Sequence, residues 1–93
     1  MAERSLQFRA HAIQRMFERS ISIGDIRTVI EAGEVIEECL DDTPYPSALY
    51  LGRAANRSLH VVAANNPEDG ATIVITVYEP DPQRWDSGFR RRL

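Results

Sequence analysis

Two neighbouring runs near the end of the chain, SLHVVAAN at residues 58–65 and ATIVITVYE at residues 71–79, decide the fold. Both are rich in β-branched and other apolar residues, which favour β-strands. In the second run Ile73, Ile75 and Val77 alternate with more polar positions, so this strand has a core face and a more exposed face. The turn between the runs is too short for a crossover helix, so we expect the two strands to pair antiparallel.

Two further strand-like runs come earlier, EVIEECL at residues 34–40 and SALYLGR at residues 47–53. The gap between them contains Pro44 and Pro46, which are typical turn residues, and the gap that follows the second run is equally short. Neither gap can hold a crossover helix. We therefore expect a four-stranded antiparallel meander over residues 34–79.

The first third of the chain has the spacing of helices. Apolar residues recur at helical intervals at Phe8, Ala12, Ile13, Met16 and Phe17. Ser22, followed three positions later by Asp25, resembles a capping box that begins a second helix, and Gly33 is placed to end it. These features predict a helical hairpin over residues 8–33, packed on one face of the sheet in an α+β fold.

The composition is that of one ordinary globular domain over residues 1–93. Hydrophobic residues make up 43% of the chain and charged residues 27%, which argues against disorder. No apolar run approaches the ~18 residues that cross a membrane, and the N-terminus lacks the apolar stretch of a signal peptide. Cys39 is the single cysteine, so no intrachain disulfide is possible. We expect a cytoplasmic protein that does not contact a membrane.

No cofactor and no metal are expected from the sequence. The glycines follow neither a phosphate-cradling nor a dinucleotide-binding pattern. The two histidines, His11 and His60, are far apart, and many of the carboxylates lie in one acidic run at residues 34–42. That run resembles an edge strand protected by charge more than a metal site.

The basic residues are all arginine, whose rigid fork suits phosphate recognition, although the net charge of the chain is −3. Residues 80–93 form a basic tail in which Trp85 and Phe89 interleave with arginines. Such a tail suits nucleotide stacking and phosphate contact. Alternatively, its aromatic side chains pin it to the domain while its arginines meet an acidic partner. The candidate phosphate-binding residues in the strand hairpin and tail are Arg53, Arg57, Arg84, Arg90 and Arg91. For the first two, an exposed hairpin end is the alternative.

His11, Arg15 and Arg19 lie four residues apart on the first predicted helix, which places them on one ridge. Two guanidinium groups beside an imidazole can hold a phosphodiester and exchange a proton near neutral pH. The alternative is a solvated helix face on which Glu18 pairs with Arg15 or Gln14.

His60 is unusual because it stands in an otherwise apolar strand, facing away from Leu59 and Val61. One interpretation is a core histidine satisfied by a backbone partner. The other is an acid or base on the open face of the sheet, where Tyr78 from the more polar side of its own strand could join it.

The chain resembles a bacterial domain-of-unknown-function family, number 4258, in FRAHAIQRMFERSISIGDIRTVIEAGEVIEE, DDTPYPSALYLGR, RSLHVVAANN and IVITVYEPDPQRW. The resemblance spans about Phe8 to Arg92 and implies a fold similar to the RelE/ParE and BrnT toxins. Ribonuclease members of that group cut messenger RNA without a metal, often on the ribosome, and an antitoxin neutralises them. Members of the present family are often encoded beside a small zinc-finger, helix-turn-helix protein that looks like an antitoxin. The matching motif residues are His11, Arg15, Arg19, His60 and Tyr78.

Two functions follow as hypotheses. The first is a metal-independent endoribonuclease of toxin type, in which His60 or His11 takes the proton from a ribose 2′-hydroxyl. Attack on phosphorus would leave a 2′,3′-cyclic phosphate and a 5′-hydroxyl, with charge stabilised by Arg15, Arg19 and Arg53. The other histidine or Tyr78 would protonate the leaving oxygen.

The second hypothesis is a non-catalytic interaction module that binds an antitoxin-like partner or a target protein. The expected partners are therefore RNA, including ribosome-bound messenger RNA, an antitoxin-like protein, and a second copy of the chain. The endoribonuclease requires His11, Arg15 and His60 to meet around one solvent-open pocket.

Overall fold

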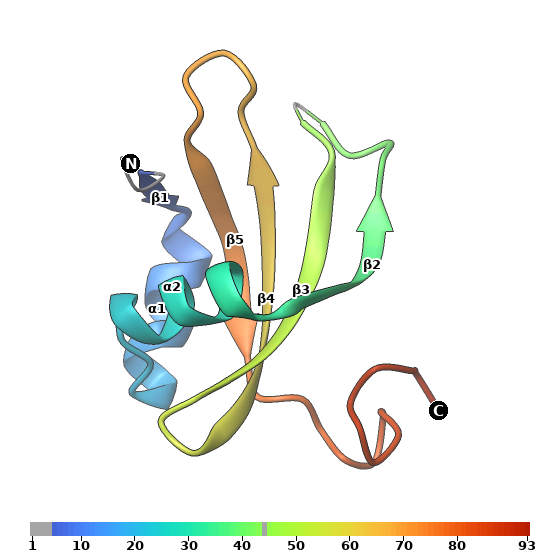
Figure 1. Ribbon diagram of the computed structural model, residues 1–93. Helices are drawn as coiled ribbons and strands as arrows, with labels where there is room; N and C mark the ends of the chain where they lie inside the picture. The colour runs from blue at the N-terminus through green and yellow to red at the C-terminus, as the bar shows by residue number, and fades with distance from the viewer. Residues whose placement is uncertain (1–4, 44) are drawn as a thin grey trace.

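Two helices cover one face of a five-stranded sheet in this computed structural model, which describes residues 5–43 and 45–93 (Figure 1). The strand order in the sheet is β1-β5-β4-β3-β2. In chain order the elements are β1 (Leu6–Phe8), α1 (Ala10–Arg19), α2 (Ile23–Ala32), β2 (Glu34–Cys39), β3 (Ser47–Ala54), β4 (Arg57–Asn65) and β5 (Thr72–Tyr78). Residues 1–4 of the predicted domain, and Pro44 of the predicted turn, lie outside the described residues.

Strands β2 to β5 form an antiparallel meander, as the short gaps between the strand-like runs predict. Each of these strands pairs antiparallel with the next one in the chain. The pairing of β4 with β5 places His60 opposite Tyr78, and the pairing of β3 with β4 places Leu51 opposite His60. The α+β class predicted from the sequence is confirmed.

The sheet contains a fifth strand, so the prediction of a four-stranded, purely antiparallel sheet is wrong. Strand β1 pairs parallel with β5, with Leu6 opposite Thr72 and Phe8 opposite Val74. Phe8 therefore lies in a strand, and the predicted helical hairpin begins at Ala10 instead. A strand of 3 residues is too short to show an alternating pattern, and its partner strand lies near the other end of the sequence.

The second helix begins at the capping box that the sequence predicts. The Ser22 hydroxyl accepts a hydrogen bond from the Asp25 backbone N–H at 3.0 Å, and the Asp25 carboxylate accepts one from the Ser22 N–H at 3.1 Å. These two bonds satisfy backbone donors that a helix N-terminus otherwise leaves unpaired. Just before them, Ser20 ends α1 in the left-handed conformation, with φ of 53°, so the chain turns sharply between the helices.

The core lies between the helices and the sheet. Its buried side chains are Ala12, Ile21, Ile26, Val29, Ala54, Leu59, Val61, Ala63, Val74 and Val77. Leu59 and Val61 belong to this cluster, and side chains alternate between the two faces of a strand. His60, which lies between them in β4, therefore points to the face of the sheet that the helices do not cover.

The C-terminal end of α2 packs closely against β3, at two positions where glycine leaves out a side chain. A Cβ atom at Gly33 would collide with the backbone oxygens of Leu51 and Val29. A Cβ atom at Gly52 would lie 3.1 Å from the Cα of Val29. Glycine at both positions lets the helix approach the sheet closely, and this approach sets the distance between α2 and β3.

We predict that Gly33→Ala lowers the free energy of unfolding by about 2 kcal/mol or more, because overpacking against fixed backbone forces the chain to move. Urea unfolding followed by tryptophan fluorescence measures the change. The matched control is Gly24→Ala, in the first turn of α2, where the nearest atom to the new Cβ is the Ser22 Oγ at 3.6 Å. Equal stability of the two variants would contradict the close approach.

Candidate functional site

Of the predicted catalytic residues, the structure brings His60 and Tyr78 together, as the alternation of their strands suggested, but it leaves His11 and Arg15 apart from them. His11 and Arg15 lie on exposed positions of α1, on the helical side of the sheet. His60 and Tyr78 lie on the opposite face, since the neighbours of His60 in β4 point towards the helices. The prediction of one pocket shared by His11, Arg15 and His60 is therefore wrong. The alternation of β4 separates the two groups by the full thickness of the sheet.

His60 is completely buried, and both of its ring nitrogens have partners. The Nε2 atom lies 2.9 Å from the carbonyl oxygen of Phe89, and Nδ1 lies 3.2 Å from the hydroxyl oxygen of Tyr78. The Trp85 ring packs edge-on against the imidazole, with ring centroids 4.5 Å apart. Of the two interpretations of this residue, the geometry matches the core histidine with a backbone partner.

These contacts define which nitrogen of the imidazole carries the proton. A carbonyl oxygen only accepts, so Nε2 carries the proton and donates it to Phe89, and Nδ1 then accepts from the Tyr78 hydroxyl. Burial lowers the pKa of His60 and raises the pKa of Tyr78. A neutral imidazole with both nitrogens engaged has no free position for the proton of a substrate.

The residues that cover His60 form a C-terminal strap, defined here as residues 80–93. Figure 1 shows the strap leaving β5 and reaching the side of the sheet where β2 lies. Trp85 of the strap is buried, and the Arg92 guanidinium lies over the Trp85 ring, 4.6 Å from its centroid. Arg92 also forms a bidentate pair with Glu37 at 3.0 and 3.1 Å.

The strap arginines are not all available for phosphate. Arg90 donates to Glu34 at 2.6 Å, so its charge is already balanced by a carboxylate of the acidic strand β2. Arg90 is one of the residues predicted from the sequence to bind phosphate, and sequence alone does not show that the tail meets this carboxylate of β2. Arg84 is exposed and lies 4.0 Å from Asp81, while Arg91 is exposed.

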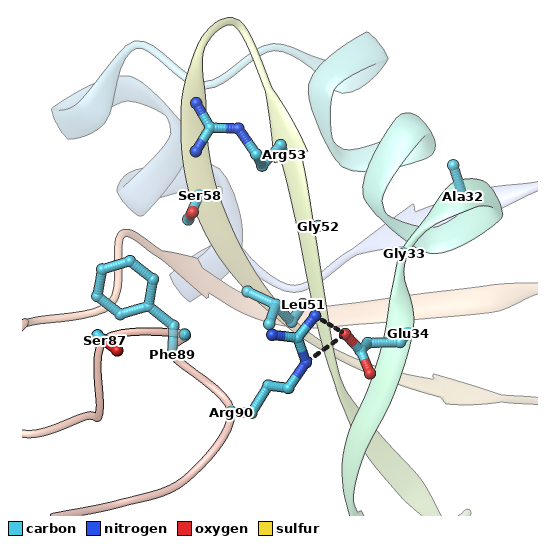
Figure 2. Close-up of a pocket in the computed structure, with 11 residues that line it drawn as sticks. Ala32, Gly33, Glu34, Leu51, Gly52, Arg53, Ser58, Ser87, Phe89 and Arg90 are labelled. Carbon is cyan, nitrogen blue, oxygen red and sulfur yellow. Dashed lines mark hydrogen bonds and ion pairs between the residues drawn. The ribbon is translucent and has the colours of Figure 1, made fainter.

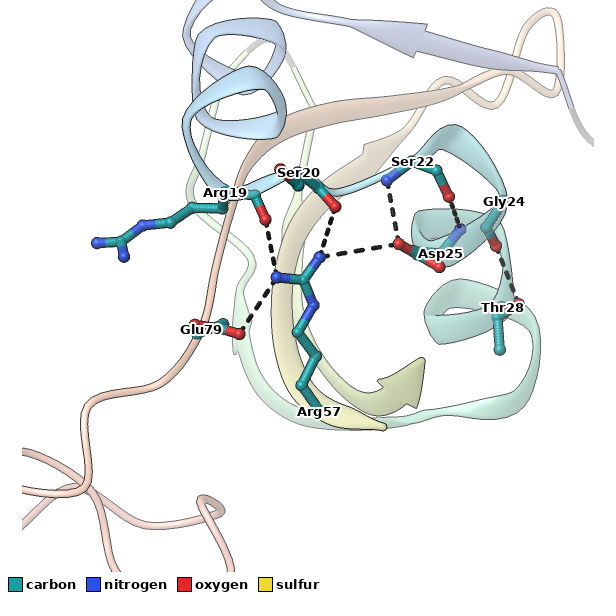
Figure 3. Close-up of polar contacts among 8 residues, drawn as sticks. All are labelled: Arg19, Ser20, Ser22, Gly24, Asp25, Thr28, Arg57 and Glu79. Carbon is teal, nitrogen blue, oxygen red and sulfur yellow. Dashed lines mark hydrogen bonds and ion pairs between the residues drawn. The ribbon is translucent and has the colours of Figure 1, made fainter. Parts of the chain in front are cut away.

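Arg57, which the sequence analysis names as a candidate phosphate-binding residue at an exposed hairpin end, has a side chain that is largely covered and engaged within the fold (Figure 3). Its guanidinium donates to the backbone oxygens of Arg19 at 2.8 Å and Ser20 at 2.7 Å. It also lies 3.3 Å from Glu79 and 3.9 Å from Asp25. Arg57 thus ties the corner between α1 and α2 to the end of β5.

The arginines that keep exposed side chains include Arg19 and Arg53. The side chain of Arg19 points away from the corner that its backbone helps to form (Figure 3). Arg15 pairs with Glu18 at 3.2 Å, which is the solvated-face alternative that the sequence leaves open. The ridge on α1 therefore contains one paired and one unobstructed guanidinium.

The sequence analysis missed an exposed apolar hollow on the helical side. It has a volume of about 380 Å³ and is lined by Phe8, Ile13, Met16, Phe17, Ile21 and Ile23. Phe17 is 84% exposed, and Ile13 and Ile23 are also exposed. The sequence did contain a signal, because the apolar stripe of α1 is wider than one buried ridge. Ala12 alone of α1 is fully buried, so part of the stripe faces solvent.

Comparison with known proteins confirms the family resemblance for residues 8–79 and leaves residues 80–92 outside the match. Residues 8–79 match the domain of unknown function DUF4258, and the chain belongs to that family. No curated protein and no solved structure gives a significant match. Within residues 5–43 and 45–93, no helix is long and apolar enough to cross a membrane. The same residues contain no group of three or more side chains of the histidine, cysteine, aspartate and glutamate types that could hold a metal.

We predict that His60 makes the protein less stable in mild acid. Burial lowers its pKa below the ordinary 6.5, so the unfolded chain takes up a proton at a pH where the folded protein does not. The free energy of unfolding should therefore fall as the pH drops from about 7.5 to 5, by at most ~1.4 kcal/mol per pH unit from this residue. Urea unfolding across this range measures the slope.

His60→Gln should have a shallower slope over the same pH range, because glutamine does not titrate. The matched control is His11→Gln, which removes the only other histidine and leaves the strap contacts in place. Identical slopes for the wild type and His60→Gln would show that His60 is not the group responsible.

We predict that Arg57→Ala lowers the free energy of unfolding by about 2 kcal/mol, because it leaves two backbone carbonyls without their charged donor. The matched control is Arg53→Ala on the other side of the same turn, which should change stability by less than about 0.5 kcal/mol. Thermal and urea unfolding measure both variants. An Arg57→Ala variant with the same free energy of unfolding as the wild type would contradict the structural role assigned to this residue.

Proposed function

We propose that this chain is a protein-interaction module that binds an acidic, amphipathic helix of a partner protein in the apolar hollow between α1 and α2. The observation that carries the proposal is the exposure of Phe17, Ile13 and Ile23 around one hollow. Exposed apolar groups that gather in one place are typical of interaction sites, whereas scattered ones are ordinary. An amphipathic helix recognises such a hollow through apolar residues at intervals of three and four.

The charges at the two ends of α1, the helix that contributes most to the hollow, favour an acidic partner over a second copy of the chain. Arg9 is the N-cap of α1, and Arg19 lies in its last turn. The first turn of α1 contains no acidic residue, and Glu18 is already paired with Arg15. Two copies of α1 facing each other would bring these positive charges together, which is unfavourable. A helix with glutamate or aspartate beside its apolar face would meet them favourably.

We further propose, on the family resemblance, that the fold is of the RelE type and that the partner is the antitoxin-like zinc-finger, helix-turn-helix protein. Two helices on one face of the β2–β5 meander support this likeness. A cytoplasmic location belongs to the same proposal.

The endoribonuclease hypothesis receives less support from the geometry. Its acid and base would have to come from one site, but His60 is sealed under the strap and His11 lies on the other side of the sheet. Binding through the apolar hollow needs no such convergence. We therefore place the interaction module first.

We predict that a synthetic helical peptide with leucines at i, i+3, i+4 and i+7 and glutamates at its other positions binds the protein. Phe17→Glu should weaken this binding by about thirtyfold, as expected for a central aromatic anchor. Fluorescence anisotropy of the labelled peptide measures the affinity. The same peptide with lysines in place of glutamates should bind more weakly to the wild type, because it meets Arg9 and Arg19 with like charge.

The matched control is Leu40→Glu, which places the same charge at another exposed apolar residue, 69% exposed and outside the hollow. It should leave peptide binding unchanged. Sedimentation should show a monomer, and a dimer abolished by Phe17→Glu would identify a second copy as the occupant and contradict the proposal. If the protein cleaves RNA in the presence of a metal chelator and His11→Ala abolishes this cleavage, the endoribonuclease hypothesis would be supported instead.

A further inference from the structure

A second hollow is separate from the apolar hollow on the helical side. It lies between the start of β2, the β3–β4 hairpin and the strap (Figure 2). Its volume is about 430 Å³, which is within the usual range for small-molecule sites. The polar, charged and aromatic residues that line it include Glu34, Arg53, Ser58, Ser87, Phe89 and Arg90. They come from three segments that are distant in the sequence, so only the folded chain brings them together.

Three polar side chains of this hollow have no partner within the described part of the protein. The Arg53 guanidinium, the Ser58 hydroxyl and the Ser87 hydroxyl take part in none of the hydrogen bonds or ion pairs among residues 5–43 and 45–93. Arg53 and Ser58 are opposite each other in the pairing of β3 with β4, so they share one face. A guanidinium next to a hydroxyl is suited to an anionic oxygen.

The charge of the hollow is close to that of one isolated arginine. Arg90 is neutralised by Glu34, and the two side chains lie together in the hollow (Figure 2). This ion pair leaves Arg53 as the charged group of the lining without a carboxylate partner among the described residues. One uncompensated positive charge favours a ligand with a single phosphate group.

An aromatic ring stands near these polar groups. Phe89 lines the hollow and is only partly buried. Its backbone has φ of 60°, a conformation that residues other than glycine rarely adopt. The hydrogen bond from His60 to its carbonyl holds the residue in place. Such strained conformations persist only where the surroundings fix them. Figure 2 shows Arg53, Ser58 and the Phe89 ring in succession along one side of the hollow.

We propose that this hollow binds a mononucleotide, with its phosphate on Arg53 and Ser58 and its base stacked on the Phe89 ring. Arginine recognises phosphate through parallel N–H groups, and a flat ring accepts any base by stacking. The hollow has room for one nucleotide, and its uncompensated positive charge at Arg53 offsets part of the charge of one phosphate group. The proposal does not depend on the apolar hollow on the helical side, because other residues line that hollow.

The experiment is a calorimetric titration of the full chain with adenosine monophosphate, uridine monophosphate, the two corresponding nucleosides and inorganic phosphate. We expect both mononucleotides to bind, and the nucleosides and inorganic phosphate each to bind at least about tenfold more weakly, since each lacks one of the two contacts. Equal binding of inorganic phosphate and the mononucleotides would overturn the role of the base. Absence of mononucleotide binding would overturn the whole proposal.

Two variants locate the site. Arg53→Gln should lower mononucleotide affinity by about tenfold to a hundredfold, through the loss of a charged hydrogen bond. Phe89→Leu should lower mononucleotide affinity by about tenfold and leave that of inorganic phosphate unchanged. Arg84→Gln is the matched control, because it removes one arginine of the strap that does not line the hollow. Circular dichroism confirms that each variant is folded, and unchanged binding in a folded Arg53→Gln would contradict the assignment.

Discussion

The requirement to satisfy a buried imidazole constrains one whole face of this protein. A polar ring that is removed from water needs a partner for each nitrogen, and an unmade hydrogen bond there costs about 1–3 kcal/mol. His60 obtains one partner from the adjacent strand β5 and the other from the backbone of the strap at Phe89. The strap can satisfy this requirement in only a narrow range of positions. The Trp85 ring and the arginine pairs with β2 then follow from that placement.

The sheet divides the molecule into two surfaces of different chemistry. On the helical side, part of the apolar stripe of α1 is buried in the core, and the rest lines the exposed apolar hollow. On the other side, aromatic, polar and charged groups of the strap meet the acidic strand β2. A protein of this size that carries two chemically distinct surfaces can meet two kinds of ligand without competition between them.

Local signals in the sequence predicted much of the fold, and long-range contacts account for most of the errors. The capping box at Ser22 and the short turns between β2 and β5 depend on near neighbours, so they could be identified. Strand β1 could not, because 3 residues show no pattern and their partner is distant.

The same distinction applies to the candidate residues. Strand alternation places His60 away from Leu59 and Val61, but it does not show that the strap will cover that face. The partner of Arg90 is 56 positions away in the sequence, and that of Arg92 is 55 positions away. Side-chain pairs at such separations are created by the fold, and no spacing rule reveals them. This is why the residue types were informative while their grouping into one catalytic site was not.

The position of the strap has a consequence for biosynthesis. A nascent chain emerges from the ribosome with its N-terminal part first, and β2 to β5 can pair as soon as Tyr78 is free. Until Trp85, Phe89 and Arg92 also emerge, His60 has no cover and the carboxylates of β2 have no counter-charge. This face therefore matures after the sheet has formed, and a pause of the ribosome shortly before residue 85 would leave the paired sheet with His60 uncovered.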